Sequence, residues 1–200
     1  PAPLPRGETI TLPETYTVGG EERSVQQFLD ETDTTGLLII HHDKIVYEQQ
    51  WRGNVPTSKT ISWSVGKSFV SALVGIAIEE GHIGSVEEPI TQYVPELAGT
   101  AYDDVRIKDV LQMSSGAQWD EDYSDPNSDI NRFGRLLALG GSLDEFMATR
   151  PREFEPGTFN RYNSTDTQAI GMLLTRATGR TLSDYLSEQL REPAGKEEHA

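Results

Sequence analysis

Residues 62–83, SWSVGKSFVSALVGIAIEEGHI, form the stretch that decides the fold. Apolar side chains recur at spacings of three and four between Val65 and Ala77, which predicts a helix of about four turns. Gly81 follows at the place where a helix is commonly capped by a glycine. We therefore expect one long helix here, with an apolar face that packs into a core.

Ser64-Val65-Gly66-Lys67 is an S-x-x-K motif at the head of this helix. Residues three apart lie on one helix face, so the Lys67 amine can reach the Ser64 hydroxyl. A serine hydroxyl attacks a carbonyl carbon only when a base takes its proton, and a lysine serves as that base when burial or a second cation lowers its pKa. The motif predicts Ser64 as nucleophile and Lys67 as base, with free backbone N–H groups nearby for an oxyanion.

Other interpretations of the same residues are open on the motif alone. Ser64 could be a helix N-cap serine followed by a solvated lysine. Gly66-Lys67-Ser68 also matches the end of a phosphate-binding loop, but the first glycine of that motif would fall at position 61, which is Ile61. The phosphate-loop interpretation is therefore excluded.

The composition excludes several classes of function. The chain has 32 acidic and 17 basic side chains and a net charge of −15, so it would repel nucleic acid and anionic lipid, and we expect neither as a partner. It contains no cysteine, which excludes disulfides, cysteine zinc sites and thiol nucleophiles. The sequence does not indicate a compartment.

Outward from the helix, the pattern divides the chain into four parts. Residues 1–35 are rich in Pro, Gly and Glu and predict an irregular lead-in with one helical turn at 25–29. Residues 36–83 begin an α/β domain, with a predicted antiparallel hairpin at 36–50 before the nucleophile helix. Residues 84–158 predict a mainly helical region. Residues 159–200 are expected to return towards the α/β domain and to stop before completing it.

Six segments in a fixed order resemble the class C β-lactamase-like serine hydrolases, a group that includes family VIII esterases, 6-aminohexanoate-dimer hydrolases and D-aminopeptidases. They are HHDKIVYEQQWRG, the stretch quoted above, EEPITQYVPEL, VRIKDVLQMSSG, EPGTFNRYNSTDTQAIGMLLTRATG and LSEQLREPAG. The resemblance implies an α/β sandwich in which helices flank an antiparallel sheet, with a further helical region. It implies no metal or organic cofactor.

The resemblance also implies a set of site residues. The family forms an acyl-enzyme on the S-x-x-K serine, and the tyrosine of a later Y-x-N motif moves protons. Tyr162-Asn163-Ser164 stands 98 residues after Ser64, which makes Ser64, Lys67 and Tyr162 the expected catalytic residues and Asn163 and Ser164 expected substrate contacts. Ser164 replaces the asparagine of Y-x-N, which favours simple esters or amides over β-lactams.

Some subgroups, including the aminohexanoate-dimer hydrolases, resemble this chain also in the loop EDYSDP, which follows the S-S-G turn. By that resemblance Tyr123 is expected to line the acyl pocket. A solvated surface loop is the alternative. We expect hydrolysis of a small-molecule ester or amide. A β-lactamase or D-Ala-D-Ala peptidase, and a non-catalytic binding module, are the alternatives.

The family closes its active site with a K-T-G or H-x-G motif on a C-terminal strand, and neither follows Tyr162. We therefore expect a companion C-terminal chain, or a missing C-terminal half, to complete the unit. Without those strands, the hairpin at 36–50 is expected to leave an unpaired edge and an exposed apolar face.

Overall fold

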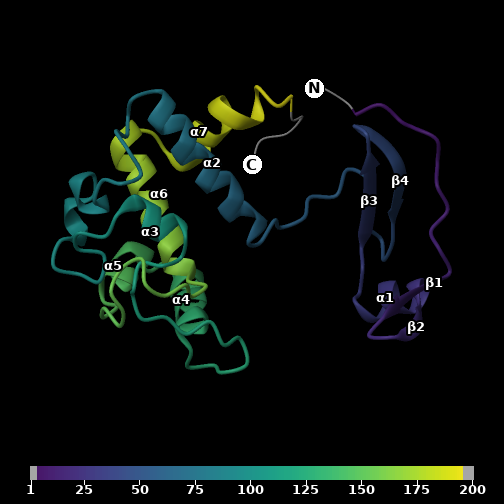
Figure 1. Cartoon of the computed structure of the whole chain (residues 1–200), viewed down its shortest axis with the longest axis horizontal. Coiled ribbons are helices and arrows are strands. Elements are labelled where there is room, and N and C mark those ends of the chain that lie inside the picture. Colours follow the sequence, from purple (N-terminus) through teal and green to yellow (C-terminus); the bar gives the residue numbers. More distant parts are fainter. Residues whose placement is uncertain (1–3, 196–200) are drawn as a thin grey trace. The chain divides into compact units, whose positions relative to one another are not determined.

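A computed structural model describes residues 4–195 (Figure 1). The chain divides between Ile61 and Ser62 into two compact units, Pro1–Ile61 and Ser62–Ala200. The predicted boundaries at 35, 83 and 158 stay predictions. No helix among the described residues has the length and apolar character that a membrane crossing requires.

The first unit contains two antiparallel strand pairs and one short helix. Strand β1 (Thr15–Val18) pairs with β2 (Glu21–Ser24), helix α1 (Val25–Glu31) follows, and β3 (Gly36–His41) pairs with β4 (Lys44–Gln50). The hairpin predicted from the two apolar runs is therefore confirmed.

The lead-in is more regular than predicted, because it contains the β1–β2 hairpin; the helical turn expected at 25–29 lies within α1. Gly19 and Gly20 have φ angles of 61° and 84°, which only glycine adopts freely and which a two-residue hairpin turn needs. The Ser24 hydroxyl accepts a hydrogen bond from the Gln27 backbone N–H at 3.3 Å and so caps α1. The hairpin signal was present in the sequence, but the high Pro and Gly content outweighed it in the prediction.

The edge of the second hairpin also differs from the expectation. Residues 5–10 run beside β4, where Gly7 N–H donates to the Ile45 carbonyl and Ile45 N–H donates to the Pro5 carbonyl, each at 2.9 Å. The expectation of an uncovered edge is thus wrong for β4. The expected apolar exposure is present, since Leu38 is 50% and Ile40 is 47% exposed.

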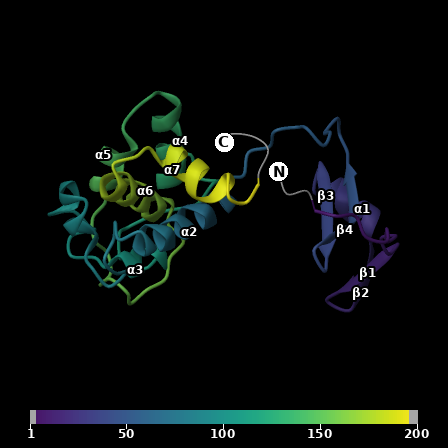
Figure 2. The same ribbon diagram turned by 90° about the horizontal axis from the view of Figure 1, so that it is seen from above.

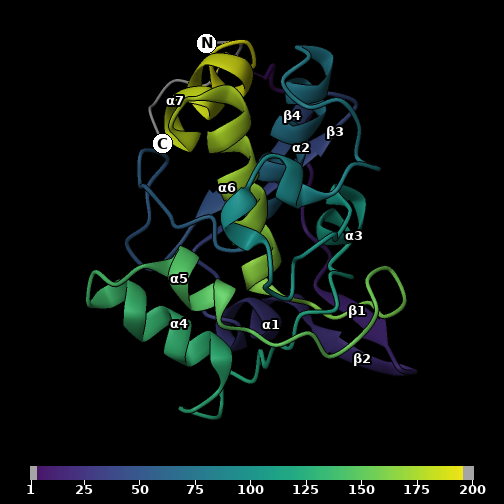
Figure 3. The ribbon, with the colours of Figure 1, turned by 90° about the vertical axis from the view of Figure 1, so that its left-hand side faces the viewer.

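The second unit is helical (Figures 1 and 3). Its elements are α2 (Val65–Glu79), the 3₁₀ turns η1 (Ile90–Gln92) and η2 (Pro95–Leu97), α3 (Ile107–Leu111), α4 (Asp129–Ala138), α5 (Leu143–Ala148), α6 (Ser164–Thr178), α7 (Leu182–Leu186) and a π-type turn η3 (Ser187–Arg191). Helix α2 covers the predicted span and ends as predicted. Gly81 has φ 77° and donates to the Ile78 carbonyl, and His82 N–H donates to the Ala77 carbonyl at 2.8 Å.

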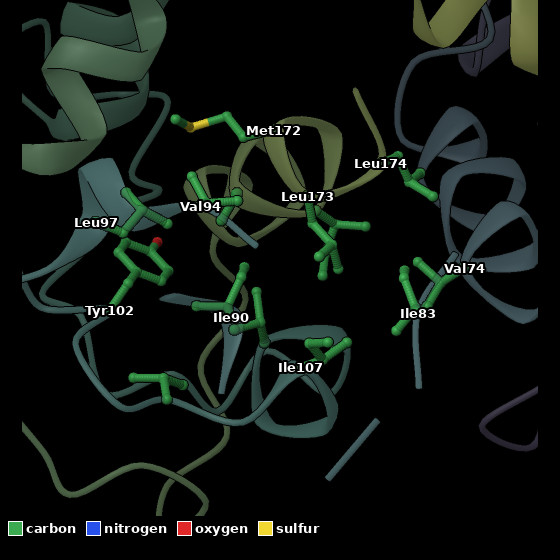
Figure 4. Packing of buried hydrophobic residues seen from close by; sticks show 14 of the residues in the cluster. Val74, Ile83, Ile90, Val94, Leu97, Tyr102, Ile107, Met172, Leu173 and Leu174 are labelled. Carbon is green, nitrogen blue, oxygen red and sulfur yellow. The ribbon is translucent and has the colours of Figure 1, made fainter. Parts of the chain in front are cut away.

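The core of this unit forms where α2 packs against α6 (Figure 2). Leu73, Val74 and Ala77 of α2 and Leu173 and Leu174 of α6 are at most 1% exposed. The apolar side chains labelled in Figure 4 surround this contact, and burying each large one contributes about 1.5–3 kcal/mol. The contact fixes the two helices relative to each other. It thereby also fixes their N-terminal ends, where the predicted nucleophile and tyrosine lie.

Candidate active site

Ser64 directly precedes α2, but its side chain does not cap the helix. Its Oγ lies 3.2 Å from Lys67 Nζ, which donates to it, and 2.7 Å from the Tyr162 hydroxyl, which also donates to it. The interpretation of Ser64 as an N-cap serine beside a solvated lysine therefore fails. The structure brings the three predicted catalytic residues together around one oxygen atom.

Lys67 and Tyr162 also contact each other. Lys67 Nζ lies 5.3 Å from the centroid of the Tyr162 ring, within the range of a cation–π contact. Tyr162 is 45% exposed and Lys67 is half-buried, so solvent and a substrate can reach this side of Ser64. Two groups that can carry a proton thus flank one hydroxyl, which is the arrangement that a nucleophile needs.

The backbone just before Ser64 is strained. Trp63 has φ 45°, in the left-handed region that costs a non-glycine residue free energy, and its side chain is 81% exposed. The turn continues into the helix, with Lys67 N–H donating to the Ser64 carbonyl at 3.1 Å. Strain of this kind gathers at functional sites, and no residue type in the sequence indicated it.

Tyr162 is held in place by a second segment of the chain. Arg161 N–H donates to the Met113 carbonyl at 2.9 Å, and Glu153 N–H donates to the Gly116 carbonyl at 2.8 Å. These bonds hold the segment that leads up to Tyr162 against the S-S-G turn, which follows α3. The position of the tyrosine therefore depends on a turn almost fifty residues earlier.

Asn163 occupies the N-cap of α6. Its side-chain oxygen accepts hydrogen bonds from the Thr165 backbone N–H at 2.9 Å and from the Thr165 hydroxyl at 2.6 Å, and the residue is 2% exposed. The structure thus uses Asn163 to begin α6. It does not place this residue among those that line the groove described below, although a substrate contact was expected of it.

A buried carboxyl group lies in the first turn of α6. Asp166 is 1% exposed, and its Oδ1 accepts from the Tyr102 hydroxyl at 2.8 Å and from the Ser115 hydroxyl at 2.7 Å. Burial raises the pKa of Asp166 to about 7, although the two hydrogen bonds act in the opposite direction. Burial likewise raises the pKa of Tyr102 well above its ordinary value. Sequence reasoning missed this cluster.

A groove of about 1010 Å³ opens beside Ser64. Ser64, Lys67, Tyr123 and Ser164 line it on the reactive side, and apolar side chains that include Phe133 of α4 line it further along. Tyr123 is 67% exposed and Ser164 is half-buried. The structure therefore brings two of the predicted substrate-contact residues to the same groove as the nucleophile.

Sequence reasoning also missed Glu121. Its carboxylate accepts hydrogen bonds from the Ser164 hydroxyl at 2.9 Å, from the Tyr123 hydroxyl at 3.0 Å and from the Trp119 indole N–H. Partial burial and the hydrogen bond to Glu121 raise the pKa of the Tyr123 hydroxyl. The loop that carries Tyr123 is thereby attached to the start of α6.

These features place a serine, a lysine and a tyrosine around one hydroxyl oxygen at the head of a buried helix. A family model described as Beta-lactamase matches residues 22–198, and the chain belongs to this family. Its fold is β-lactamase/transpeptidase-like, as predicted.

Individual relatives agree with this assignment. The chain is 32% identical over 173 residues to a 6-aminohexanoate-dimer hydrolase of Paenarthrobacter ureafaciens, covering 83% of this chain and 44% of the relative. It is 26% identical to a putative D-alanyl-D-alanine carboxypeptidase of Escherichia coli K12, covering 81% and 42%. A solved structure, a putative 6-aminohexanoate-dimer hydrolase from Bacillus anthracis, superposes with a TM-score of 0.78 at 19% identity, covering 98% and 53%. The chain thus spans about half the length of these relatives.

Proposed function

We propose that the protein to which this chain belongs is a serine hydrolase that cleaves an ester or amide through an acyl-enzyme on Ser64. One observation carries the proposal: Ser64 Oγ contacts both Lys67 Nζ and the Tyr162 hydroxyl. A binding module of the same fold would have no need to keep this arrangement. The homology alone supports only a hydrolase of the β-lactamase family.

The proposed reaction has two steps. In the first, Ser64 Oγ attacks the carbonyl carbon while a neutral Lys67 amine takes the hydroxyl proton. The Tyr162 hydroxyl, hydrogen-bonded to the same oxygen, passes a proton to the leaving alcohol or amine as the carbon–heteroatom bond breaks. In the second step water attacks the carbonyl carbon of the acyl-enzyme, and the same groups take its proton. The bond between this carbon and Ser64 Oγ then breaks, and Oγ regains a proton.

The oxyanion of each tetrahedral intermediate needs hydrogen-bond donors, and each donor contributes about 10² to 10³ in rate. The start of α2 offers backbone N–H groups close to Ser64. Because the chain spans about half the length of its relatives, we also propose that a companion C-terminal segment, on this or a second chain, supplies the remaining donor.

We propose simple esters or amides as substrates, ahead of β-lactams. The Ser164 hydroxyl, which stands where the family motif has an asparagine amide, already donates its proton to Glu121. It therefore cannot at the same time donate to a substrate carbonyl. Some relatives are named β-lactamases or putative D-alanyl-D-alanine carboxypeptidases, and these names support the β-lactamase and D-Ala-D-Ala peptidase alternatives.

Covalent labelling tests the proposal most directly. A fluorophosphonate probe should modify Ser64 of the whole protein, as located by peptide mass spectrometry, and Ser64→Ala should abolish the labelling. Turnover of a short-chain nitrophenyl ester, a D-amino-acid amide, an aminohexanoate oligomer and a chromogenic cephalosporin then ranks the substrates. Absence of labelling at Ser64 in protein shown to be folded would reject the hydrolase proposal and favour the binding module.

A further inference from the structure

Tyr162 lies between two attachments to the turn that follows α3. On its N-terminal side, the Arg161 N–H donates to the Met113 carbonyl at 2.9 Å. On its C-terminal side, the Ser115 hydroxyl donates to Asp166 Oδ1 at 2.7 Å. The first attachment uses the backbone, whereas the second depends on the side chain of Asp166.

Asp166 also ends a row of four oxygen atoms that begins beside Tyr162. In order, they are Asn163 Oδ1, Thr165 Oγ1, the Tyr102 hydroxyl oxygen and Asp166 Oδ1, and the successive distances are 2.6, 2.9 and 2.8 Å. All four residues are at most 2% exposed, so the row is shielded from solvent. The buried carboxyl is thereby connected to the residue that begins α6 and follows Tyr162.

Each of the three contacts in the row needs one proton between its two oxygens. Asn163 Oδ1 has no proton and also accepts from the Thr165 backbone N–H, so the Thr165 hydroxyl proton must lie on this first contact. With an ionised carboxylate, Tyr102 donates to Asp166, and no proton is left for the contact between Tyr102 and Thr165. A protonated Asp166 donates to Tyr102 instead, and every contact then holds a proton.

The second carboxyl oxygen of Asp166 favours the same protonation state. Oδ2 is buried and has no hydrogen-bond partner among the described residues. A buried oxygen that shares a negative charge and accepts no hydrogen bond is costly, and protonation removes the charge. The burial that raises the pKa of Asp166 to about 7 acts in the same direction.

The partly or fully buried charged side chains on the helices that pack against α6 have other partners. They are Lys67 of α2, which donates to Ser64, Lys108 and Asp109 of α3, which pair with Glu87 and Arg106, and Asp144 of α5, which accepts from Gln168. Tyr102 is the titratable group that contacts Asp166, and burial raises its pKa well above the ordinary value. The protonation of Asp166 is therefore the change that the row responds to near neutral pH.

We propose that Asp166, in its protonated form, is a positioning residue that holds the Tyr162 hydroxyl at Ser64. It acts through Ser115 and through the row of oxygens that ends at Asn163. The inference rests on the proposed hydrolase function and adds a supporting residue to the same site. When Asp166 loses its proton, the Tyr102 hydroxyl turns towards the carboxylate, and the contact that supports the cap of α6 is lost. Activity should therefore fall as the pH rises through the pKa of Asp166, about 7.

The first test compares two tyrosine variants in nitrophenyl ester hydrolysis by the whole protein. Tyr102→Phe removes a hydroxyl from the middle of the row. Tyr185→Phe is the matched control, because it removes an equally buried hydroxyl that donates to Glu80, at the end of α2 opposite Ser64. Tyr102→Phe should lower kcat at least about tenfold and change KM less than about threefold, since a displaced Tyr162 impairs the chemical step. Tyr185→Phe should change kcat less than about threefold at a temperature where both variants are folded.

The second test changes Asp166 itself. The amide of Asp166→Asn supplies a donor and an acceptor and does not ionise, so kcat at pH 6 should stay within about threefold of the parent and the fall above pH 7 should disappear. Asp166→Leu has a similar volume but makes no hydrogen bonds. It should lower kcat at least about tenfold at both pH values, and thermal unfolding checks that it is folded.

Infrared difference spectra of the parent and Asp166→Asn examine the proton without using activity. At pH 6 the folded parent should show the C=O stretch of one additional protonated carboxyl group, and this band should be absent at pH 9. The row requires a proton on Asp166, so a folded parent without the band at pH 6 would reject the inference.

The outcomes separate this inference from the proposed function. If the fluorophosphonate labels Ser64, the positioning role is rejected and the hydrolase proposal stands in either of two cases. One is that Tyr102→Phe and Tyr185→Phe lower kcat equally, and the other is that Asp166→Asn keeps the pH profile of the parent. If Ser64 is not labelled in folded protein, both proposals are rejected.

Discussion

The Tyr162 hydroxyl lies 2.7 Å from Ser64 Oγ although the two residues are 98 positions apart in the sequence. Two contacts produce this proximity. The buried faces of α2 and α6 pack against each other, and Arg161, next to Tyr162, is hydrogen-bonded to Met113 after α3. The helical core therefore brings the serine, the lysine and the tyrosine together.

Ser64→Ala and Lys67→Ala should each reduce kcat roughly 10⁴-fold or more, and the double variant should be little worse. A nucleophile and the base that takes its proton act in one step, so removing either removes the step. Steady-state hydrolysis of a nitrophenyl ester by the whole protein measures this. Losses that multiply in the double variant would contradict a shared step.

Tyr162→Phe should reduce kcat strongly while leaving the midpoint of thermal unfolding nearly unchanged. The change removes only a hydroxyl from a side chain that is 45% exposed, so little packing is lost. The hydrogen bond to Ser64 disappears with it. Activity within about threefold of the parent would remove Tyr162 from the proposed proton transfer.

The sequence predicted α2 and its glycine cap because both depend on residues close together in the chain. It did not predict the partners of Glu121, since the direction of a side chain in a loop depends on the tertiary fold. Ser164, one of those partners, is 43 residues away. The motif nevertheless predicted the contact between Ser64 and Lys67, because a spacing of three on a helix fixes their proximity.

The sequence missed one local element and one structural role. The Gly19-Gly20 turn was counted as part of an irregular segment because composition outweighed a local hairpin signal. Asn163 was expected to contact substrate because the motif compares residue types and cannot show that the side chain is used to cap α6.

Gly116→Ala should destabilise the protein much more than Gly99→Ala. Both glycines have positive φ angles, 81° and 75°, so both variants lose about 1 kcal/mol or more to backbone strain. A Cβ at Gly116 would lie 2.0 Å from the Phe154 carbonyl oxygen, whereas a Cβ at Gly99 meets nothing within 4 Å. Urea unfolding should show an extra loss of roughly 2 kcal/mol or more at Gly116. Equal losses would mean that the turn can move away from Phe154.

Asp166 should make the protein less stable as the pH rises from about 4 to about 7. Its pKa in the folded protein is about 7, above the ordinary value of 3.8, because the carboxyl is buried. Between these two values the folded state holds a proton that the unfolded state has released, so the free energy of unfolding falls with rising pH. The contribution is fully present below pH 4 and is lost once the pH has passed about 7. Each pKa unit corresponds to about 1.4 kcal/mol, so the whole change is on the order of 4 kcal/mol.

Asp166→Asn isolates this contribution, because its amide keeps an oxygen for the hydroxyls of Tyr102 and Ser115 but does not titrate. Tyr102 is the titratable group that faces Asp166, and its raised pKa keeps it neutral over this range. Urea unfolding at several pH values gives the free energy of the parent minus that of the variant, and this difference should decrease from pH 4 to pH 7 and then level off. Asp122→Asn is the matched control: hydrogen bonds from Ser124 lower the Asp122 pKa below its ordinary value of 3.8, so its contribution is lost only in more acidic solution and the corresponding difference should stay nearly flat from pH 4 to pH 7. A difference for Asp166 that is flat, or that increases with pH, would show that the buried carboxyl is already ionised in acid.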